Sequence, residues 1–334
     1  MVDFNNAKQE KLIANSERSE RNGKGDNGKK VMTLKTVKKK ETLFLISLLA
    51  FPIVQFIIFY IILNINSICL AFQEWDEGKG KFIFTGLDNF GMVFDDLFQP
   101  DGRLRNAIKN STIQFLISSG LGIPLHIVVS YAIFKEIHFS KLYKVLLVLP
   151  SMISSMVFVV CARHLLIDGM QELLGDPGLN LLNPYTRTSF WTVLWFGFWM
   201  QFSSGMIIYL GAMSNISVDV MEYSKLEGLS TLRELWSIVL PLIYPTITTY
   251  VVVAIAGFFT NQGYYFSFMG AGSLTGTTLY DNLAYVFFTK LAHQDSTQVQ
   301  YPYAAAGGLL FTLILAPLTF LVKYLMEKYG PSEE

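Results

Sequence analysis

Six long apolar stretches separate the charged residues of this chain and limit what it can fold into. A helix needs about 20 apolar residues to cross the hydrocarbon core of a bilayer, and charged residues make up only 16% of the chain, against about 25% in soluble domains. A soluble helical protein would show a polar stripe along each helix, and the residues from Phe44 to Leu63 show almost none. The sequence therefore predicts an all-α integral membrane protein with six transmembrane helices, near Leu43–Phe72, Ile113–Phe134, Leu142–Leu165, Phe190–Met213, Val239–Phe259 and Ala304–Leu325.

The first 41 residues are polar and poor in large apolar side chains. Such a segment buries too little surface to offset the entropy of ordering it. We therefore expect residues 1–41 to form a disordered basic tail before a transmembrane domain over residues 42–334. The tail holds eleven of the 26 Lys and Arg, which favours a cytoplasmic amino terminus. Without the tail, the remaining basic residues divide almost equally between the two sides and give no orientation.

The tail also bears on partners. Its basic end, from Lys35 to Lys40, suits anionic lipid head groups, so membrane lipids are an expected partner. The formal net charge of the whole chain is zero, which gives no indication of a nucleic-acid partner.

A glycine- and lysine-rich stretch of the tail, Gly23–Lys30, matches the spacing of a dinucleotide-binding motif and nearly matches a phosphate-binding loop. Either motif needs a strand before it and a helix after it, and the preceding residues are all polar. The last position is Lys30, where a magnesium-binding hydroxyl is required. We interpret the stretch as a flexible linker. We therefore expect no cofactor in this chain and no ATP site, so that a partner would hydrolyse any ATP.

The segment between the fourth and fifth apolar runs, about residues 217–238, has the pattern of two short helices joined by a turn. Asp219 can cap the first helix, with Glu222 as its reciprocal partner three residues later. Gly228 stands where a helix ends in a left-handed residue. The first helix is therefore predicted to end at a sharp turn.

The second helix of this segment begins with another predicted capping box, Thr231 with Glu234, and continues into the fifth apolar run. A short helix that projects from the membrane and is tied to a spanning helix can act as a mechanical lever. An ordinary helical hairpin between two spans has the same pattern, and helix physics alone favours that simpler interpretation.

This segment resembles the signature loop of the permeases of binding-protein-dependent importers, roughly E-A-A-x-x-x-G-A followed by an apolar helix and L-P. The two alanines are replaced by Tyr223 and Ser224, and the alanine after the glycine by Leu229. These departures bear on how closely the loop packs against a partner. The matching residues are Glu222, Gly228, Trp236, Ile238, Leu240, Pro241 and Pro245.

Four further stretches resemble the carbohydrate-uptake branch of that family, which includes the maltose-type permeases. The first apolar run ends in Ser67–Trp75, and Gly86–Phe90 follows it. The third run contains Leu149–Ser155, and Tyr303–Ala306 precedes the last run. The family pattern is weak at Gly270–Gly272, where a T-G-G-G-P run is usual.

The resemblance implies the fold of a type I ABC importer permease in a bacterial plasma membrane, with both termini in the cytoplasm. It also implies three kinds of partner: a second homologous permease, two cytoplasmic ATPase subunits that bind ATP and Mg²⁺, and an extracytoplasmic solute-binding protein or lipoprotein. The chain would be no enzyme itself and would import sugars or oligosaccharides by alternating access. The resemblance places in the ATPase-coupling loop Asp219, Glu222, Tyr223, Ser224, Glu227, Gly228, Leu229 and Arg233.

Sugars are bound by aromatic faces and by amide or hydroxyl hydrogen bonds. Aromatic residues near span ends also form the interfacial belt of membrane proteins, so this chemistry alone does not assign them to a site. The candidates for the substrate pathway are Trp195, Trp199, Gln201, Asn261, Gln262 and Tyr264. The sequence does not name the sugar.

The alternatives are a permease of the same superfamily for a non-sugar solute, a channel, or a membrane enzyme. A channel would need a selectivity ring or an arginine series, and neither is present. A membrane enzyme would need several intramembrane His, Asp or Glu residues, and the apolar runs contain almost no acids. We interpret His126 and His164 as packing or boundary residues and expect no metal site.

Overall fold

The computed structural model describes residues 34–100, 102–176, 178–270, 279–292, 298 and 300–331. The chain forms two compact units, Met1–Asn64 and Ile65–Glu334. Most of the predicted tail and the whole Gly23–Lys30 stretch lie outside the described residues, as do two residues of the weak Gly270–Gly272 match.

The described part of the first unit contains helix α2 (Leu34–Phe56), a π-helical turn η1 (Ile57–Ile62) and the first two residues of α3 (Leu63–Leu70), and the rest of α3 belongs to the second unit. The predicted tail ended at residue 41, but α2 begins at Leu34. Lys and Leu are good helix formers, and a helix already nucleated by the apolar run extends at little cost.

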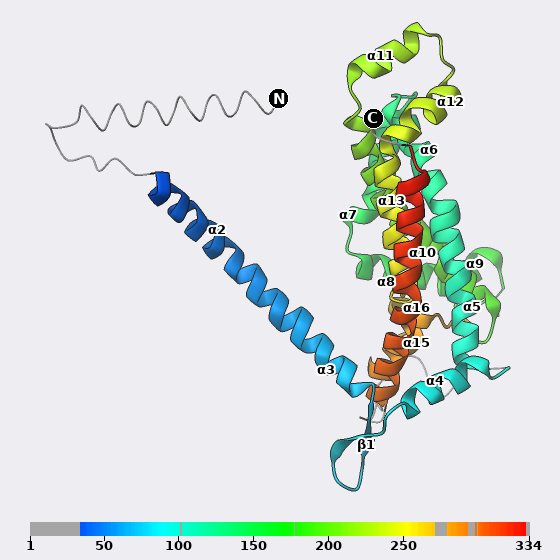
Figure 1. The fold of residues 1–334 in the computed structure, drawn as a ribbon. Coiled ribbons are helices and arrows are strands. Elements are labelled where there is room, and N and C mark those ends of the chain that lie inside the picture. The colour runs from blue at the N-terminus through cyan, green and yellow to red at the C-terminus, as the bar shows by residue number, and fades with distance from the viewer. Residues whose placement is uncertain are drawn as a thin grey trace, which may run out of the picture. The chain divides into compact units, whose positions relative to one another are not determined.

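The second unit is a bundle built around α10 (Figure 1). Among the described residues of the whole chain, five helices are long and apolar enough to cross a membrane, including Phe44–Leu70 of the first helix. The four in the bundle are continuous helices, although π-helical turns interrupt two of them. They are α5–η2–α6 (Arg103–Phe115, Leu116–Leu121, Gly122–Phe134), α10 (Arg187–Ser214), α12–η4–α13 (Thr231–Glu234, Leu235–Val239, Leu240–Ala256) and α16 (Gln300–Tyr329).

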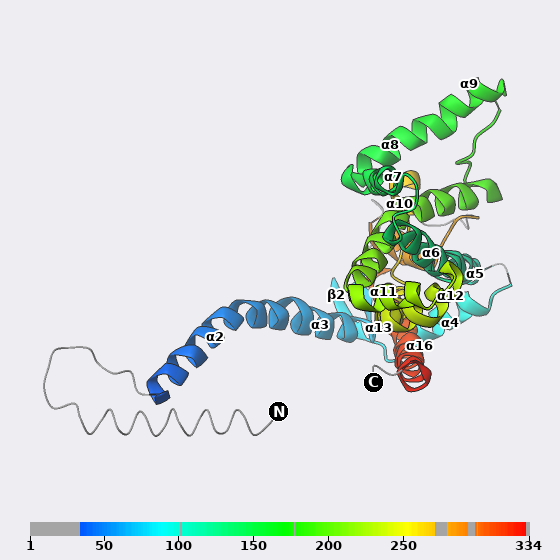
Figure 2. The ribbon, with the colours of Figure 1, turned by 90° about the horizontal axis from the view of Figure 1, so that it is seen from above.

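The predicted third span is broken. It consists of α7 (Ser140–Met152) and a second helical stretch, α8–η3–α9 (Ser155–His164, Leu165–Gly169, Met170–Leu174), whose directions differ by 94°. Figure 2 shows α8 and α9 extending sideways from the bundle. The six predicted spans are therefore five, or six if this bent pair counts as one.

Local chemistry explains the break. Pro150 has no N–H to continue the helical hydrogen bonds. The Ser151 hydroxyl donates to the Val148 carbonyl at 2.7 Å, a bond that competes with the helix and bends it. Ile153 and Ser154 are then extended, and the next helix begins at Ser155. Apolar length alone does not detect such a break.

Short elements connect the spans, and one of them is not helical. The strands β1 (Gln73–Asp76) and β2 (Lys81–Phe84) form a short antiparallel hairpin within an otherwise helical fold, which keeps the predicted all-α class. Asp76 accepts hydrogen bonds from the backbone N–H groups of the turn, and the Lys79 ammonium holds its pKa below the usual value. The short helices are α4 (Asp88–Phe98), α11 (Val218–Leu226), α14 (Tyr265–Met269) and α15 (Leu283–Ala292).

Polar residues along α5 fasten the start of α15 to the bundle. Arg103 donates to the Asp281 carboxylate at 2.7 Å, and the Asn110 amide donates to the Asp281 carbonyl at 2.7 Å. The Ser111 hydroxyl accepts from the backbone N–H of Leu283 at 2.9 Å. These residues lie about two helical turns apart on one face of α5, so α15 and α5 form one rigid corner.

Candidate functional site

Helix α11 projects from one end of the bundle (Figure 1). Its N-cap is Ser217, whose hydroxyl accepts from the backbone N–H of Val220 at 3.4 Å. The predicted cap, Asp219, lies inside the first turn instead, where its charge suits the positive end of the helix dipole. The predicted Asp219–Glu222 capping box is therefore wrong, because a serine two residues earlier takes the position.

The end of α11 is the predicted left-handed turn. Gly228 has a φ of +70°. Its N–H donates to the Lys225 carbonyl at 3.1 Å, and the N–H of Leu229 donates to the Ser224 carbonyl at 3.2 Å. These two bonds are the Schellman motif that terminates a helix. A Cβ added to Gly228 would meet no described atom within 4 Å, so the backbone angle alone selects glycine here.

Helix α12 has a different start from the one predicted. Its N-cap is Ser230, and no side chain caps it. Glu234 does not return to Thr231 but is buried, with 2% of its surface exposed. It accepts instead from the Lys135 ammonium at 2.9 and 3.0 Å and from the Tyr131 hydroxyl at 3.0 Å. A charged donor from the end of α6 therefore replaces the local capping interaction.

Residues of α11, the following turn, α12 and η4 together line a depression of about 720 Å³. Tyr223 is exposed, and its hydrogen bond with Glu227 raises the pKa of the phenol, because ionisation would place two negative charges together. Of the eight residues predicted for the coupling loop, Glu222 and Gly228 are exposed outside the depression, and Ser224 is fully buried. The other five line it: Asp219, Tyr223, Glu227, Leu229 and Arg233.

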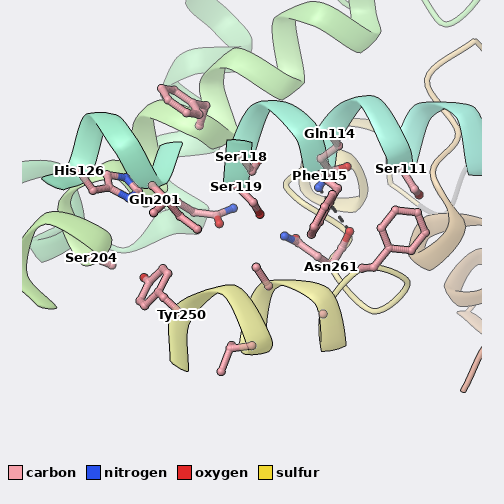
Figure 3. Close-up of a pocket in the computed structure, with 16 residues that line it drawn as sticks. Ser111, Gln114, Phe115, Ser118, Ser119, His126, Gln201, Ser204, Tyr250 and Asn261 are labelled. Atoms are coloured by element: carbon pink, nitrogen blue, oxygen red, sulfur yellow. Dashed lines mark hydrogen bonds between the residues drawn. The ribbon is translucent and has the colours of Figure 1, made fainter. Parts of the chain in front are cut away.

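A second hollow lies inside the bundle, between α5–η2–α6, α10 and α13 (Figure 3). Its volume is about 450 Å³, within the size range of small-molecule sites. Among the described residues, the lining contains no Asp, Glu, Lys or Arg. Its polar members are Ser111, Gln114, Ser118, Ser119, His126, Gln201, Ser204, Tyr250 and Asn261, and its apolar members include Phe115, Phe198 and Phe258.

Two of the six residues predicted for the substrate pathway, Gln201 and Asn261, line this cavity. Trp195 packs against Phe198, and Trp199 packs edge-on against Phe158. Both tryptophans lie outside the cavity lining.

The other two predicted pathway residues also lie elsewhere. Tyr264 packs edge-on against Phe196 and close to Gly197, and the half-buried Gln262 precedes it in the loop after α13. Neither lines the cavity. Of the three amide residues among the candidates, Gln201 and Asn261 therefore line the cavity and Gln262 does not.

Several lining residues were missed in the sequence. Ser111, Gln114 and Ser118 follow a helical spacing at the beginning of the second apolar run and just before it, and such a polar stripe is the signal that could have identified them. His126 is a packing residue, as predicted, because its ring lies 4.7 Å from that of Phe202. It is also part of the cavity wall, and its buried Nδ1 has no hydrogen-bond partner among the described residues.

One end of the cavity is held by a hydrogen-bonded trio of amides. Gln114 donates to the Asn261 carbonyl at 3.4 Å, as Figure 3 shows, and accepts from the Asn282 amide at 2.9 Å. Asn282 also donates to the Asn261 carbonyl at 3.3 Å. The rigid corner of α5 and α15 is thus continuous with the cavity wall.

Known proteins resemble this chain over most of its length. A protein family described as "Binding-protein-dependent transport system inner membrane component" matches residues 101–331. The multiple sugar-binding transport system permease protein MsmF of Streptococcus mutans is 21% identical over 286 residues, which cover 83% of this chain and 93% of MsmF. The probable starch degradation products transport system permease protein AmyD of Thermoanaerobacterium thermosulfurigenes is 24% identical and covers 85% of this chain and 91% of AmyD.

The fold is also found in a solved structure. A chain of a bacterial alginate ABC transporter, crystallised in complex with an alginate pentasaccharide-bound periplasmic protein, superposes with a TM-score of 0.66 at 19% sequence identity. The match covers 89% of this chain and 98% of the other. The bundle described above is therefore a known permease architecture.

Proposed function

Because the family match spans well over half of the chain, the protein belongs to the inner membrane components of binding-protein-dependent transport systems, and we propose that it imports sugars or short oligosaccharides. In this proposal it pairs with a second, homologous permease and takes its solute from an extracytoplasmic binding protein. Two cytoplasmic ATPase subunits supply the energy, and both termini lie in the cytoplasm of a bacterial cell. The names of MsmF and AmyD support the choice of carbohydrate.

The observation that carries the proposal is the rigid projection of α11 and α12 from the bundle. The Schellman turn at Gly228 fixes the angle between the two helices, and α12 continues directly into the apolar helix α13. ATP drives transport only if it favours one conformation over the other. A projecting helix that is continuous with a spanning helix can transmit such a bias from an ATPase to the membrane.

The cavity supports an uncharged polyhydroxylated solute. Its amides and hydroxyls can exchange hydrogen bonds with sugar hydroxyls, and its phenylalanine rings can contact the apolar faces of a sugar. A carboxylate or phosphate would lose its hydration there without a compensating Lys or Arg among the described lining residues, which is costly. We therefore propose neutral saccharides as the substrate class.

The test is transport by the complete reconstituted complex with its cognate binding protein. Loading the binding protein with a short neutral oligosaccharide should stimulate ATP hydrolysis and drive uptake into the vesicles. Uptake of a matched uronic acid oligomer should be far weaker. ATP hydrolysis by this chain alone, or ATP hydrolysis that no saccharide stimulates, would contradict the proposal.

The orientation can be tested separately. A reporter that works only in the cytoplasm should be active when fused after Gly228 and inactive when fused near Gly86. The opposite pattern would place α11 on the wrong side of the membrane for an ATPase.

A further inference from the structure

A single buried carboxylate ties α11 and α12 to the end of α6. Both oxygens of Glu234 are used: Oε1 accepts from Lys135 Nζ at 2.9 Å and from the Tyr131 hydroxyl at 3.0 Å, and Oε2 accepts from Lys135 Nζ at 3.0 Å and from the Ser224 hydroxyl at 3.1 Å. Tyr131 and Lys135 belong to α6 and its C-cap, whereas Ser224 belongs to α11. Three elements therefore meet at one side chain.

Burial makes this contact specific. A carboxylate removed from water must be satisfied by charge and hydrogen bonds, and losing one partner is costly. Glu234 is 2% exposed. Its carboxylate oxygens therefore cannot exchange their protein hydrogen-bond donors for water unless the helices move apart. The Tyr131 hydroxyl has a second acceptor in the Thr231 carbonyl, at 2.9 Å, which adds the start of α12 to the same cluster.

Helix α6 connects this cluster with the cavity. Ile123 and His126 of α6 line the cavity, and Tyr131 of the same helix binds Glu234. His126 and Tyr131 are five residues apart, about 7.5 Å along the helix axis. A displacement of α11 that is passed to Glu234 therefore reaches the cavity wall through less than two turns of one helix.

Ser224 brings α11 into the cluster, and it is fully buried. Its hydroxyl lies 3.1 Å from Glu234 Oε2 and 2.8 Å from the Met221 carbonyl. A buried hydroxyl needs an acceptor, and the single hydrogen of Ser224 is shared between the Met221 carbonyl and Glu234 Oε2.

We propose that Glu234 is a positioning residue that joins α11, α12 and α6 into one rigid body, so that movement of the coupling loop displaces the cavity wall. The inference rests on the proposed transport function and adds the route by which it works. Glu234 touches neither the solute cavity nor the exposed depression on α11. It acts only through the helices that it joins.

The first test is Glu234→Gln in the reconstituted complex. Glutamine keeps the shape and removes the charge, while Lys135, with 22% of its side chain exposed, can still reach water. The uptake per ATP hydrolysed should fall about tenfold, at unchanged amounts of assembled complex. Glu327→Gln is the matched control, since it removes an exposed ion pair with Lys323 on α16, and it should leave the ratio unchanged.

A double-mutant cycle tests whether the pair acts as a unit. Lys135→Met should reduce the uptake per ATP hydrolysed. The double variant with Glu234→Gln should show no larger reduction than the more severe of the two single variants. Lys135→Arg keeps a charged donor and should restore most of the ratio. Simply additive effects would contradict a joint role.

A distance measurement gives a readout that does not depend on transport. Spin labels at Val128→Cys on α6 and Val218→Cys on α11, two exposed positions, would be placed after Cys69 and Cys161 are replaced by serine. In the parent protein we expect one narrow distribution of distances between the two labels, with the same mean in the presence and absence of ATP. Glu234→Gln should broaden it. A distance that changes with ATP in the parent would overturn the rigid-body proposal.

A milder variant covers the case in which Glu234→Gln does not assemble. Ser224→Ala removes one hydroxyl from the cluster and leaves the Lys135–Glu234 ion pair in place, so the complex should form and the uptake per ATP hydrolysed should fall about twofold. An unchanged ratio and an unchanged distance width for Ser224→Ala would overturn the proposal. If the unmodified complex shows no saccharide-stimulated uptake while its labels report one rigid body, the proposed function fails and the structural inference does not.

Discussion

Among the described residues of the bundle, two buried ion pairs link different elements. The elements that carry them, the beginnings of α5 and α15 for one pair and α12 with the end of α6 for the other, lie at opposite ends of the bundle (Figure 1). Asp281, at the start of α15, is fully buried and bound by Arg103 of α5. Glu234, at the end of α12, is almost as buried and bound by Lys135 after α6. Both pairs connect segments far apart in the sequence. Their surroundings differ. The Arg103–Asp281 pair holds α15 against the bundle, whereas the Lys135–Glu234 pair connects the projecting helices α11 and α12 with α6.

The Asp281 pair is built for rigidity. Arg103 contacts both carboxylate oxygens, at 2.7 and 3.4 Å, through a planar group that fixes geometry as well as charge. Asn110 and Ser111 add bonds to the adjacent backbone, and α15 packs in the same apolar cluster as α5 and α16. The Glu234 pair uses a flexible lysine, and the elements that it joins, α11 and α12, project beyond the bundle. We expect substitutions in the Arg103–Asp281 pair to reduce mainly the stability of the fold. Substitutions in the Lys135–Glu234 pair should reduce mainly the coupling of uptake to ATP hydrolysis.

The largest expected effect is that of Arg103→Ala. It leaves the Asp281 carboxylate buried without its cation, which should lower the free energy of unfolding by about 3–5 kcal/mol. Denaturant unfolding of the purified protein in detergent measures this. Arg105→Ala is the control, because Arg105 is exposed two residues further along the same helix, and it should change stability by less than about 0.5 kcal/mol.

If Arg103→Ala and Lys135→Met lowered the free energy of unfolding by the same amount, the two ends of the bundle would not differ in this way. Lys135→Met should cost less, about 1–3 kcal/mol, because Tyr131 and Ser224 continue to donate hydrogen bonds to Glu234.

The second prediction concerns the turn at Gly228. Its φ of +70° costs a side-chain-bearing residue about 1–2 kcal/mol, so Gly228→Val should tilt α11 while the spans stay folded. The complex should assemble and hydrolyse ATP but lose most of its uptake. Gly80→Val is the matched control, since Gly80 has a φ of +60° and an added Cβ there also meets no described atom.

Gly80→Val should bear the same strain in the β1–β2 hairpin without uncoupling transport. Normal uptake by Gly228→Val would show that the α11–α12 segment only connects two spans.

The third prediction lies between the two ends, at the cavity. Gln201→Ala should raise the solute concentration for half-maximal uptake about fivefold, as expected for one lost hydrogen bond of about 1 kcal/mol. Stability should hardly change, because Gln201 is exposed to the cavity. Trp199→Phe is the control outside the lining, and initial uptake rates at several concentrations provide the comparison. A stronger effect of Trp199→Phe would place the pathway elsewhere.

The smallest effect on stability is expected for Glu222→Ala. Glu222 is exposed and Ser217 supplies the helix cap, so the free energy of unfolding should change by less than about 0.5 kcal/mol. Ser217→Ala should cost about 1 kcal/mol. Any loss of uptake by Glu222→Ala would then come from a contact with the ATPase, and it should be milder than that of Gly228→Val. If Glu222→Ala lowered the free energy of unfolding more than Ser217→Ala, the acidic residues and not Ser217 would cap the helix.

Much of the fold follows from the sequence because its causes are local. Hydrocarbon requires long apolar helices with internally satisfied backbones, and composition shows where they lie. The turn at Gly228 was also predictable, since a left-handed helix end depends on one residue and its immediate neighbours. The broken third span was not identified, because apolar length does not show where Pro150 and nearby serine hydroxyls interrupt the helix.

The tertiary structure alone decided what the buried polar residues do. From local rules Glu234 was a helix cap, but Lys135, 99 residues earlier, supplies a charged donor that a backbone N–H cannot match in a buried site. Gln114, Asn261 and Asn282 likewise meet only when three distant segments pack together. A side chain's local pattern states which bonds it can make, whereas burial decides which partner it must have, and burial is a property of the whole bundle.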